Sequence, residues 1–588
     1  MKRVLVLVTA MVLAVAIVPI ASAQDEGDEI TLRVGITQDW DGLNPGLNYS
    51  VPSYDVWNLQ YMALTDKAAA DFATIPSLAE SWDVSDDKLT YTYHLREGLV
   101  WSDGEPLTAE DVVWNINTSR DQGWDNMIAT VANLDATAVD DLTVQVTTAV
   151  PDPKLPTLDM YLVPPQAWEP IATDYDAAMQ YGGASEDKVG SGPFVVTDFT
   201  KGQSVTMEVN PSFFGWNGEE PPYDRIVFRL FENPDAMVAA LQQNELDVIH
   251  GFPAGSWDTL DADPNIEVVA GQQGGFDEIA INGGALPEGQ PHPALLDLKV
   301  REAISHGIDR AAVIEDLWFG QAAPLETLSP SPDPKWIPEI PEADVFDYDP
   351  DQSNQILDDA GYADSDGDGI REMPDGTPIV LRHAVNTDGD LAPTIGDLFV
   401  GWMEAIGIGV EISSYDQDAL YDVIATGQYD TFFWGWTPFV DPDPMLSYFT
   451  AAEVGNYNDA NWSDPRYDEL YLEQNQELDP ERRVEIVHEM LTLFHDAAVY
   501  IPMYVSPDLQ AYRTDTFEGW VKQPAEIGAV IFSNTSPSYV LLSPISAEAG
   551  DSGSNNLLVI GGVVVGVVVI GGIFLAMRKR STTADDRE

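Results

Sequence analysis

Residues 78–116 read LAESWDVSDDKLTYTYHLREGLVWSDGEPLTAEDVVWNI, and this stretch decides the fold. Apolar residues alternate with polar ones at Leu89, Tyr91, Tyr93 and Leu95. That period of two is typical of a half-buried strand, and polar turns flank it on both sides. A helix is predicted to begin after Thr108, with Asp111 as the acidic half of a capping box. Its buried stripe is expected at Val112, Val113 and Ile116.

The same string resembles a signature segment of family 5 of the extracytoplasmic solute-binding proteins, the peptide, dipeptide and nickel cluster that serves ABC importers. The elements AESW, YTYHLREG and WSDGEPLTAEDV carry the likeness. Other segments resemble the family in the same order: 190–194, 223–228, 239–248, 299–310, 464–468 and 501–504. The resemblance spans roughly residues 30–545.

The resemblance implies an α/β fold of the periplasmic-binding-protein type, with two lobes, a hinge and an extra subdomain (cluster C). The chain is also too long for a single core. Lobe I would combine 28–65, 190–283 and 503–545. The extra subdomain would be 66–189, and lobe II would be 284–502.

The two ends of the chain carry different signals. Lys2 and Arg3 precede a short apolar run and a small-residue cleavage site, which predicts a signal peptide over 1–23. Residues 557–577 carry no charge and would rise about 31 Å as a helix, enough to cross a bilayer. The basic residues that follow place the tail 578–588 in the cytoplasm. A polar stalk, 543–556, would join this span to an ectodomain outside the cell.

Composition fits an exposed acidic domain. Lys and Arg number 27 against 98 Asp and Glu, which gives a net charge of −71. Such a surface repels nucleic acid, so no nucleic-acid partner is expected. Hydrophobic residues make up 44% of the chain, which argues against disorder. The absence of cysteine excludes disulfides and thiolate metal sites.

Catalytic motifs are missing, since the chain has no HExxH motif, Walker loop or cysteine nucleophile. The sequence therefore predicts a binding protein and not an enzyme. It would deliver oligopeptides or a similar small polar solute to ABC permease and ATPase subunits by closing its cleft. Two alternatives stay open, a secreted hydrolase and a receptor that senses a solute without transport.

One loop has the spacing of a calcium site. Hard Ca²⁺ prefers six to eight oxygen ligands, and alternate acids in a loop supply them. The candidate ligands are Asp364, Asp366, Asp368, Ile370 through its carbonyl, Glu372 and Asp375. The alternative is a metal-free polar loop, and no cofactor is required for the predicted function.

The candidate ligand site depends on the resemblance. Residues 430–443 are similar to a family segment that lines the cleft, which implies ligand contacts at Trp436 and Thr437. We expect one of Trp434 and Trp436 to be a core residue. Peptide-binding relatives place an Asp just beyond, where this chain has Phe439, and Asp441 follows two residues later.

Weaker candidates come from other parts of the chain. The resemblance implies ligand contacts at Trp40, Asn44, Trp124 and Tyr504. Four Asn-X-Ser/Thr sequons are possible glycosylation sites: Asn48, Asn117, Asn461 and Asn534.

Overall fold

The computed structural model describes residues 29–545, apart from 125–126, 128–129, 159, 182–188, 219–220, 390, 534 and 536. The predicted signal peptide 1–23, membrane span 557–577 and tail 578–588 lie outside these residues. Within the described part of the chain, no helix is long and apolar enough to span a membrane.

The signature segment folds as its pattern predicts. Strand β5 (Thr90–Leu95) buries Tyr91, Tyr93 and Leu95 and exposes more of the residues between them. Helix α2 (Ala109–Gln122) begins after Thr108, whose backbone N–H donates to Asp111 Oδ2 at 2.8 Å. Val112 and Ile116 are fully buried, whereas Val113, which was also expected in the buried stripe, is half-buried. The predicted strand and helix are therefore confirmed.

These two elements form the centre of the extra subdomain. Its antiparallel sheet has the order β4 (Ala79–Val84), β5, β7 (Thr143–Thr148) and β6 (Leu134–Asp140). Two short helices complete it, α4 (Pro165–Trp168) and α5 (Tyr175–Met179). A hairpin of β2 (Thr65–Lys67) and β3 (Thr74–Pro76) joins it to lobe I. One hydrophobic core gathers side chains from Leu47 to Tyr181, so the subdomain packs as a unit.

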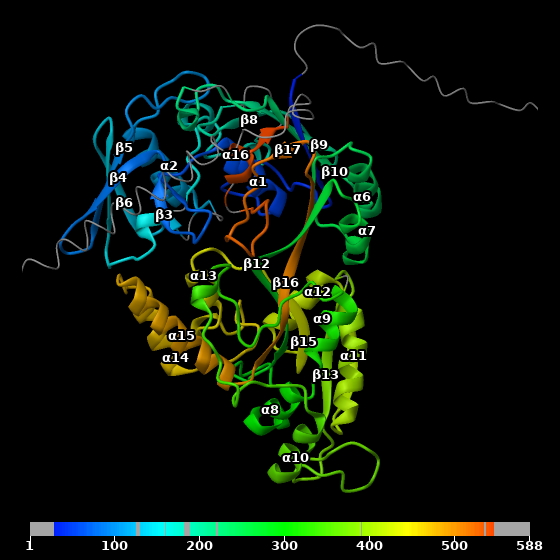
Figure 1. Ribbon diagram of the computed structural model, residues 1–588. Helices are drawn as coiled ribbons and strands as arrows, with labels where there is room; N and C mark the ends of the chain where they lie inside the picture. The colour runs from blue at the N-terminus through cyan, green and yellow to red at the C-terminus, as the bar shows by residue number, and fades with distance from the viewer. Residues whose placement is uncertain are drawn as a thin grey trace, which may run out of the picture.

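A single ten-stranded sheet runs through both lobes (Figure 1). Its order is β14 (Gly409–Tyr415), β13 (Val380–Asn386), β15 (Thr431–Trp436), β12 (Ile266–Ile281), β16 (Tyr500–Arg513), β11 (Val248–His250), β1 (Thr31–Ile36), β10 (Arg225–Leu230), β9 (Ser204–Val209) and β8 (Phe194–Thr200). The two lobes lie at opposite ends of this order.

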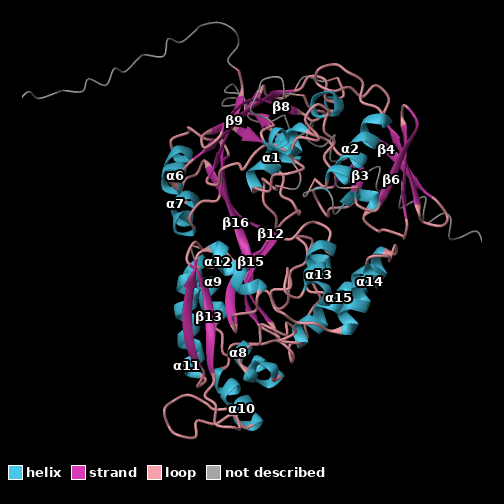
Figure 2. Ribbon diagram, turned by 180° about the vertical axis from the view of Figure 1, so that it is seen from behind, coloured by secondary structure: helices cyan, strands magenta, loops and turns pink. Residues whose placement is uncertain are grey.

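Lobe I is built on the β11 to β8 end. β1 pairs in parallel with β10 and with β11, and β9 and β8 add antiparallel strands. Its helices are α1 (Val51–Gln60), α6 (Pro234–Gln242), α7 (Trp257–Asp261) and α16 (Pro537–Leu541). Figure 2 shows α6 and α7 together at the outer side of this lobe, away from the extra subdomain.

Lobe II is built on the β14 to β15 end. α11 (Ala392–Ala405) packs against β13, β14 and β15. The other helices are α8 (Leu298–His306), α9 (Arg310–Trp318), α10 (Pro350–Ala360), α12 (Gln417–Ala425), α13 (Asp443–Tyr448), α14 (Pro465–Gln474) and α15 (Pro480–Asp496). Two hydrophobic clusters on this side of the sheet order form its core.

Strands β12 and β16 run from one lobe into the other (Figures 1 and 2). Gln272 pairs with Pro507 and Phe276 pairs with Val505. Between these two pairs β12 contains two more residues than β16, which forms a bulge. Gly274 lies inside this bulge with φ 76°. Left-handed backbone favours glycine, so the bulge has a local cause in the sequence.

The bulge corrects two predicted lobe boundaries. We expected lobe I to include β12 to residue 283 and β16 from residue 503. Instead, Phe276 and Ile279 on β12 and Tyr504 and Val505 on β16 pack in the lobe II core. The lobes change at the bulge because the pairing breaks there.

The predicted stalk also begins later than expected. Ser543–Pro544 form strand β18, which pairs with β17 (Phe517–Glu518). The last described residues therefore belong to lobe I, and the rest of the predicted stalk lies outside the described residues.

Gly274→Ala should destabilise the protein more than Gly98→Ala. Both glycines have φ 76°, but a Cβ at Gly274 would lie 2.7 Å from the Pro332 backbone, while one at Gly98 would meet nothing within 4 Å. The backbone conformation alone costs an L-residue about 1–2 kcal/mol. Denaturant unfolding of both variants measures the difference. Equal losses would mean that the bulge accepts a side chain without moving.

Candidate solute-binding site

The end of β15 brings the predicted ligand segment beside the bulge. Trp436 is the last residue of the strand and pairs with Phe276. The loop 437–442 then leads into α13, and Ser331 Oγ donates to Val440 O at 2.6 Å to hold this loop. In Figure 1, α13 lies on the side of lobe II that is turned toward lobe I and the extra subdomain. The segment therefore occupies the face between the lobes.

An ion pair crosses between the two sides at α13. Lys154 of the extra subdomain places its Nζ 2.6 Å from Asp443 Oδ2, at the first residue of α13. Gln474 donates to the other Asp443 oxygen at 2.9 Å. Burial lowers the pKa of Lys154, but the carboxylates of Asp443 and Asp152 outweigh it and raise that pKa overall. The ammonium therefore stays charged in this contact.

Three aromatic rings form a ladder on this face, made of Trp436, Tyr448 and Tyr457. The first two ring centroids are 5.1 Å apart, and the last two are 4.9 Å apart with planes 24° apart. Tyr457 is 53% exposed, whereas Trp436 is half-buried. The ladder thus presents flat apolar surface from the protein interior to solvent, a surface suited to an organic solute.

The neighbouring predicted residues have different surroundings. Thr437 is exposed, and Phe439 is 44% exposed. Trp434 is half-buried against Tyr421. The expectation that one of Trp434 and Trp436 is a core residue is wrong. Residues two apart on a strand share one face, and both are half-buried.

Asp441 already has a partner. Its two carboxylate oxygens accept from Arg483 Nη1 and Nη2, each at 2.7 Å. Burial alone would raise the pKa of the Asp441 carboxyl, but Arg483 outweighs it and holds that pKa below its ordinary value. Asp441, the acid that follows the position of the relatives' Asp, is therefore already paired with Arg483 through both of its oxygens.

The weaker candidates all lie in packed interior. Trp40 and Tyr504 are 0% exposed, and Trp124 is 2% exposed against Trp168. Asn44 is also 0% exposed, and its amide donates to Ala178 O at 2.7 Å. The structure does not bring these four side chains to the face that carries Trp436. The resemblance predicted ligand contacts for these residues because it locates chain segments near the cleft. It does not predict the direction in which each side chain points.

The acidic loop gathers four of the predicted metal ligands. Ligand oxygens of Asp364, Asp366, Asp368 and Glu372 all lie within 4.8 Å of one another. Asp375 is not in this cluster, and its carboxylate accepts from the Thr377 backbone at 3.0 Å. The prediction of Asp375 as a ligand is therefore wrong, because Pro374 and Asp375 enter a turn toward β13.

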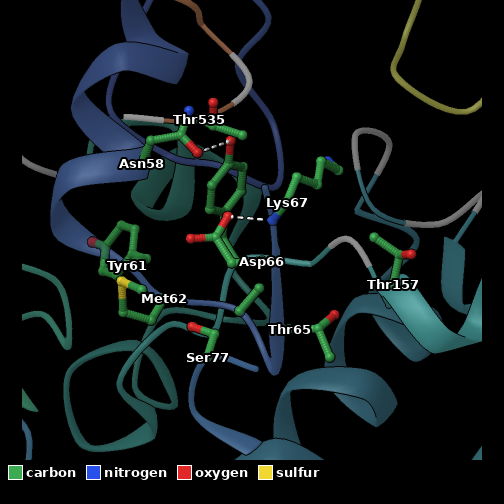
Figure 3. Close-up of a pocket in the computed structure, with 11 residues that line it drawn as sticks. Asn58, Tyr61, Met62, Thr65, Asp66, Lys67, Ser77, Thr157 and Thr535 are labelled. Atoms are coloured by element: carbon green, nitrogen blue, oxygen red, sulfur yellow. Dashed lines mark hydrogen bonds between the residues drawn. The ribbon is translucent and has the colours of Figure 1, made fainter. Parts of the chain in front are cut away.

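A small cavity lies where α1 meets the extra subdomain (Figure 3). Asn58 of α1 and Tyr61, the residue after α1, line it together with Asp66 and Lys67 of β2 and Thr157. Its volume of ≈ 50 Å³ suits one or two water molecules and not an organic solute. The ladder face therefore remains the better candidate for solute binding.

Two of the predicted sequons are closed to modification in the folded protein. Asn48 is 0% exposed and Asn461 is 0% exposed. Asn117 lies on α2 and accepts from Arg120 at 3.1 Å, and Asn534 lies outside the described residues.

Sequence reasoning missed the groups beneath Trp436. The indole Nε1 donates to Tyr500 Oη at 2.7 Å, and that hydroxyl also contacts the carboxyl groups of Glu278 and Asp459. The residues come from β12, β15, β16 and a loop, and no spacing in the chain links them. The residues come together only in the folded protein, where β15 and β16 both pair with β12.

The comparisons with known proteins agree with this architecture. The model for bacterial extracellular solute-binding proteins, family 5, matches residues 73–458. The chain is 24% identical to the dipeptide-binding protein of Escherichia coli (strain K12) over 529 residues, which are 84% of this chain and 92% of that protein. It is also 24% identical to heme-binding protein A of Haemophilus influenzae over 517 residues, which are 82% of this chain and 88% of that protein.

A solved structure shows the same fold. The crystal structure of NikA from Brucella suis in complex with Fe(III)-EDTA superimposes with a TM-score of 0.71 and 22% sequence identity. The likeness covers 87% of this chain and 100% of that one. The predicted two-lobed α/β fold is therefore confirmed.

Proposed function

The chain belongs to family 5 of the bacterial extracellular solute-binding proteins, and from this premise we propose that it binds a small solute between its lobes and delivers it to an ABC importer. Members of this family are binding proteins rather than enzymes. The single observation that carries the proposal is the pair of strands, β12 and β16, that joins two separately packed lobes at a bulge. Hinge closure about such a connection is a known way to enclose a ligand.

The ladder face supports a site for an organic solute. Trp436, Tyr448 and Tyr457 would supply apolar contact, and the backbone of loop 437–442 would supply polar groups. The Lys154–Asp443 pair supports closure, because it joins the extra subdomain to lobe II at the edge of this face.

The class of solute follows less directly. A dipeptide, haem and a ferric chelate are named for the similar proteins. We propose a peptide as the solute. Because Arg483 already binds both Asp441 oxygens, a peptide's ammonium group would need another partner or would lie in solvent.

Trp436→Ala should weaken solute binding at least about tenfold, since a buried aromatic contact contributes roughly 1.5 kcal/mol or more. Calorimetric titration of the ectodomain with a short-peptide mixture, with haemin and with Fe(III)-EDTA measures this loss and identifies the class. Trp520→Ala is the matched control, because Trp520 is also half-buried but packs on Tyr512 in lobe I. Unchanged affinity in Trp436→Ala would place the site elsewhere, and turnover of a peptide would support the hydrolase alternative.

Residues 557–577 are proposed to tether the ectodomain to the cell membrane as a single span, with the preceding residues outside the cytoplasm. The charge-free run and the basic residues after it support this. A chain ended after Asn556 should appear in the soluble fraction, while the full chain sediments with membranes. A truncated chain that still resists extraction from membranes by salt would disprove the tether.

The loop 364–372 is proposed to bind Ca²⁺ through Asp364, Asp366, Asp368 and Glu372, with Ile370 adding its carbonyl. The four clustered carboxylates support this. Ca²⁺ at a hundred times its Kd would stabilise the fold by about 2.7 kcal/mol. Thermal unfolding with Ca²⁺ and with EDTA should differ in the wild type and in Asp375→Ala, but not in Asp366→Ala. A calcium-induced shift in Asp366→Ala that equals the wild-type shift would remove the proposed ligand set.

A further inference from the structure

Two carboxyl groups are buried beneath the solute face. Glu278 of β12 is 0% exposed, and Asp459 is 4% exposed. Tyr500 lies between them, with its Oη 3.1 Å from Glu278 Oε1 and 3.0 Å from Asp459 Oδ2. The same hydroxyl accepts the Trp436 indole N–H at 2.7 Å. One phenol oxygen thus connects two buried acids to the innermost ring of the ladder.

Counting hydrogens at Tyr500 shows that this cluster needs one more proton. A tyrosine hydroxyl has one hydrogen to donate and two lone pairs. Trp436 uses one lone pair, and the hydroxyl hydrogen can satisfy only one of the two acids. If both were ionised, the second carboxylate would face the phenol oxygen with no hydrogen between them. A proton on one acid lets it donate to the remaining lone pair, and every contact is then satisfied.

The proton belongs on Glu278. Its second oxygen, Oε2, has no hydrogen-bond partner among the described residues. An unpartnered oxygen costs less in a neutral carboxyl group than in a carboxylate, because a buried charge must be compensated. The Asp459 carboxylate can then accept the hydrogen of Tyr500.

The other titratable groups around the pair do not supply a positive charge. Asp277 and Tyr504 act on Glu278 from β12 and β16, and Tyr429 approaches Asp459 by donating its hydroxyl to the Asp459 carbonyl. Asp277 is another carboxyl group and the two tyrosines are neutral phenols, so none of the three compensates a second negative charge at the pair. Burial raises the pKa of Asp459 to about 7, and burial together with repulsion from Asp459 raises the pKa of Glu278 well above its ordinary value.

We propose that Glu278 and Asp459 hold one shared proton through Tyr500, and that this proton positions the Trp436 indole in the solute site. Loss of the proton leaves two carboxylates that repel each other beside Tyr500. The Tyr500 hydroxyl and the Trp436 indole that is bonded to it should then shift from their present positions. Asp459 also donates its backbone N–H to Tyr457 O at 2.8 Å, which ties the outer ring of the ladder to the same acid. Glu278 and Asp459 are positioning residues, and their link to solute binding rests on the proposed function.

The direction of the pH effect follows from the raised pKa values. The folded protein holds this proton more tightly than the unfolded chain, in which carboxyl groups titrate near about 4. The pair's contribution to stability is therefore fully present below about pH 4 and decreases as pH rises through about 7 and above. The ladder should be ordered at acidic and neutral pH and disturbed in alkali.

Glu278→Gln tests the shared proton without any solute. A glutamine amide can donate to Tyr500 at every pH, so this variant should keep the ladder but lose its pH dependence. Infrared difference spectra at neutral pH should show a smaller C=O band of protonated carboxyl groups in Glu278→Gln than in the wild type, because other buried acids such as Asp55, whose pKa burial raises to about 7, keep their share of the band. Glu267→Gln is the matched control, because Glu267 is an exposed acid on the same strand and its replacement should leave the band in place.

The effect on Trp436 has its own readout. The emission difference between the wild type and Trp436→Phe should change between about pH 5 and about pH 9, and it should stay constant when both proteins also carry Glu278→Gln. The wild-type Tm should fall relative to that of Glu278→Gln by on the order of 3 °C over this range. If Glu278→Gln does not fold, Asp459→Asn replaces it, and Glu278 should then lose its proton at a lower pH because the repulsion is gone.

An unchanged infrared band in Glu278→Gln, or parallel pH curves for the wild type, Glu278→Gln and Glu267→Gln, would overturn the inference. Neither measurement needs a solute. They therefore fail or succeed independently of the binding experiments that test the proposed function.

Discussion

The pairing of β12 with β16 is the constraint on which the rest of the molecule depends. Both lobes contain part of these two strands. On one side of the bulge their side chains pack in the core of lobe I, and on the other side they pack in the core of lobe II. Trp436 pairs with the first β12 residue beyond that bulge, so the solute face lies directly beside the connection between the lobes. A rotation there would move the ladder relative to lobe I, and Trp318 of α9, which packs against a hydrophobic cluster of each lobe, would have to shift with it.

The acidic composition also explains how charge is used inside the fold. The chain has 27 basic residues against 98 acids, and the three arginines that are buried in the described residues, Arg371, Arg483 and Arg513, each form an ion pair. Arg483 binds Asp441, and Arg513 binds Asp515. Neither Glu278 nor Asp459 forms an ion pair with a basic side chain of the described residues, so one shared proton takes the place of a cation in our proposal. A chain with so few cations leaves some buried acids to be neutralised by protons.

The sequence predicted local structure well and side-chain directions poorly. Alternation at Tyr91 and Tyr93 and the Thr108–Asp111 capping box depend on neighbouring residues, and both were confirmed. The family resemblance placed Trp436 in the segment that lines the cleft, and the structure shows that this residue lies beside the strands that join the lobes. The resemblance could not predict the ion pair between Arg483 and Asp441 or the complete burial of Trp40. Both depend on contacts between residues that are distant in the chain. The Glu278–Tyr500–Asp459 cluster had no signal in the sequence for the same reason.

In the proposed mechanism the lobes close on a solute by bending at the bulge. The chain has no cysteine, so two introduced cysteines can carry a fluorophore pair without competing labels. Val139 on β6 of the extra subdomain is 60% exposed and Leu472 on α14 of lobe II is 62% exposed, so both positions accept labels. Single-molecule energy transfer should show the 139–472 distance shorten when solute is added, while a control pair within lobe II, 412–472, stays constant. A 139–472 distance that does not change while solute is bound would contradict hinge closure.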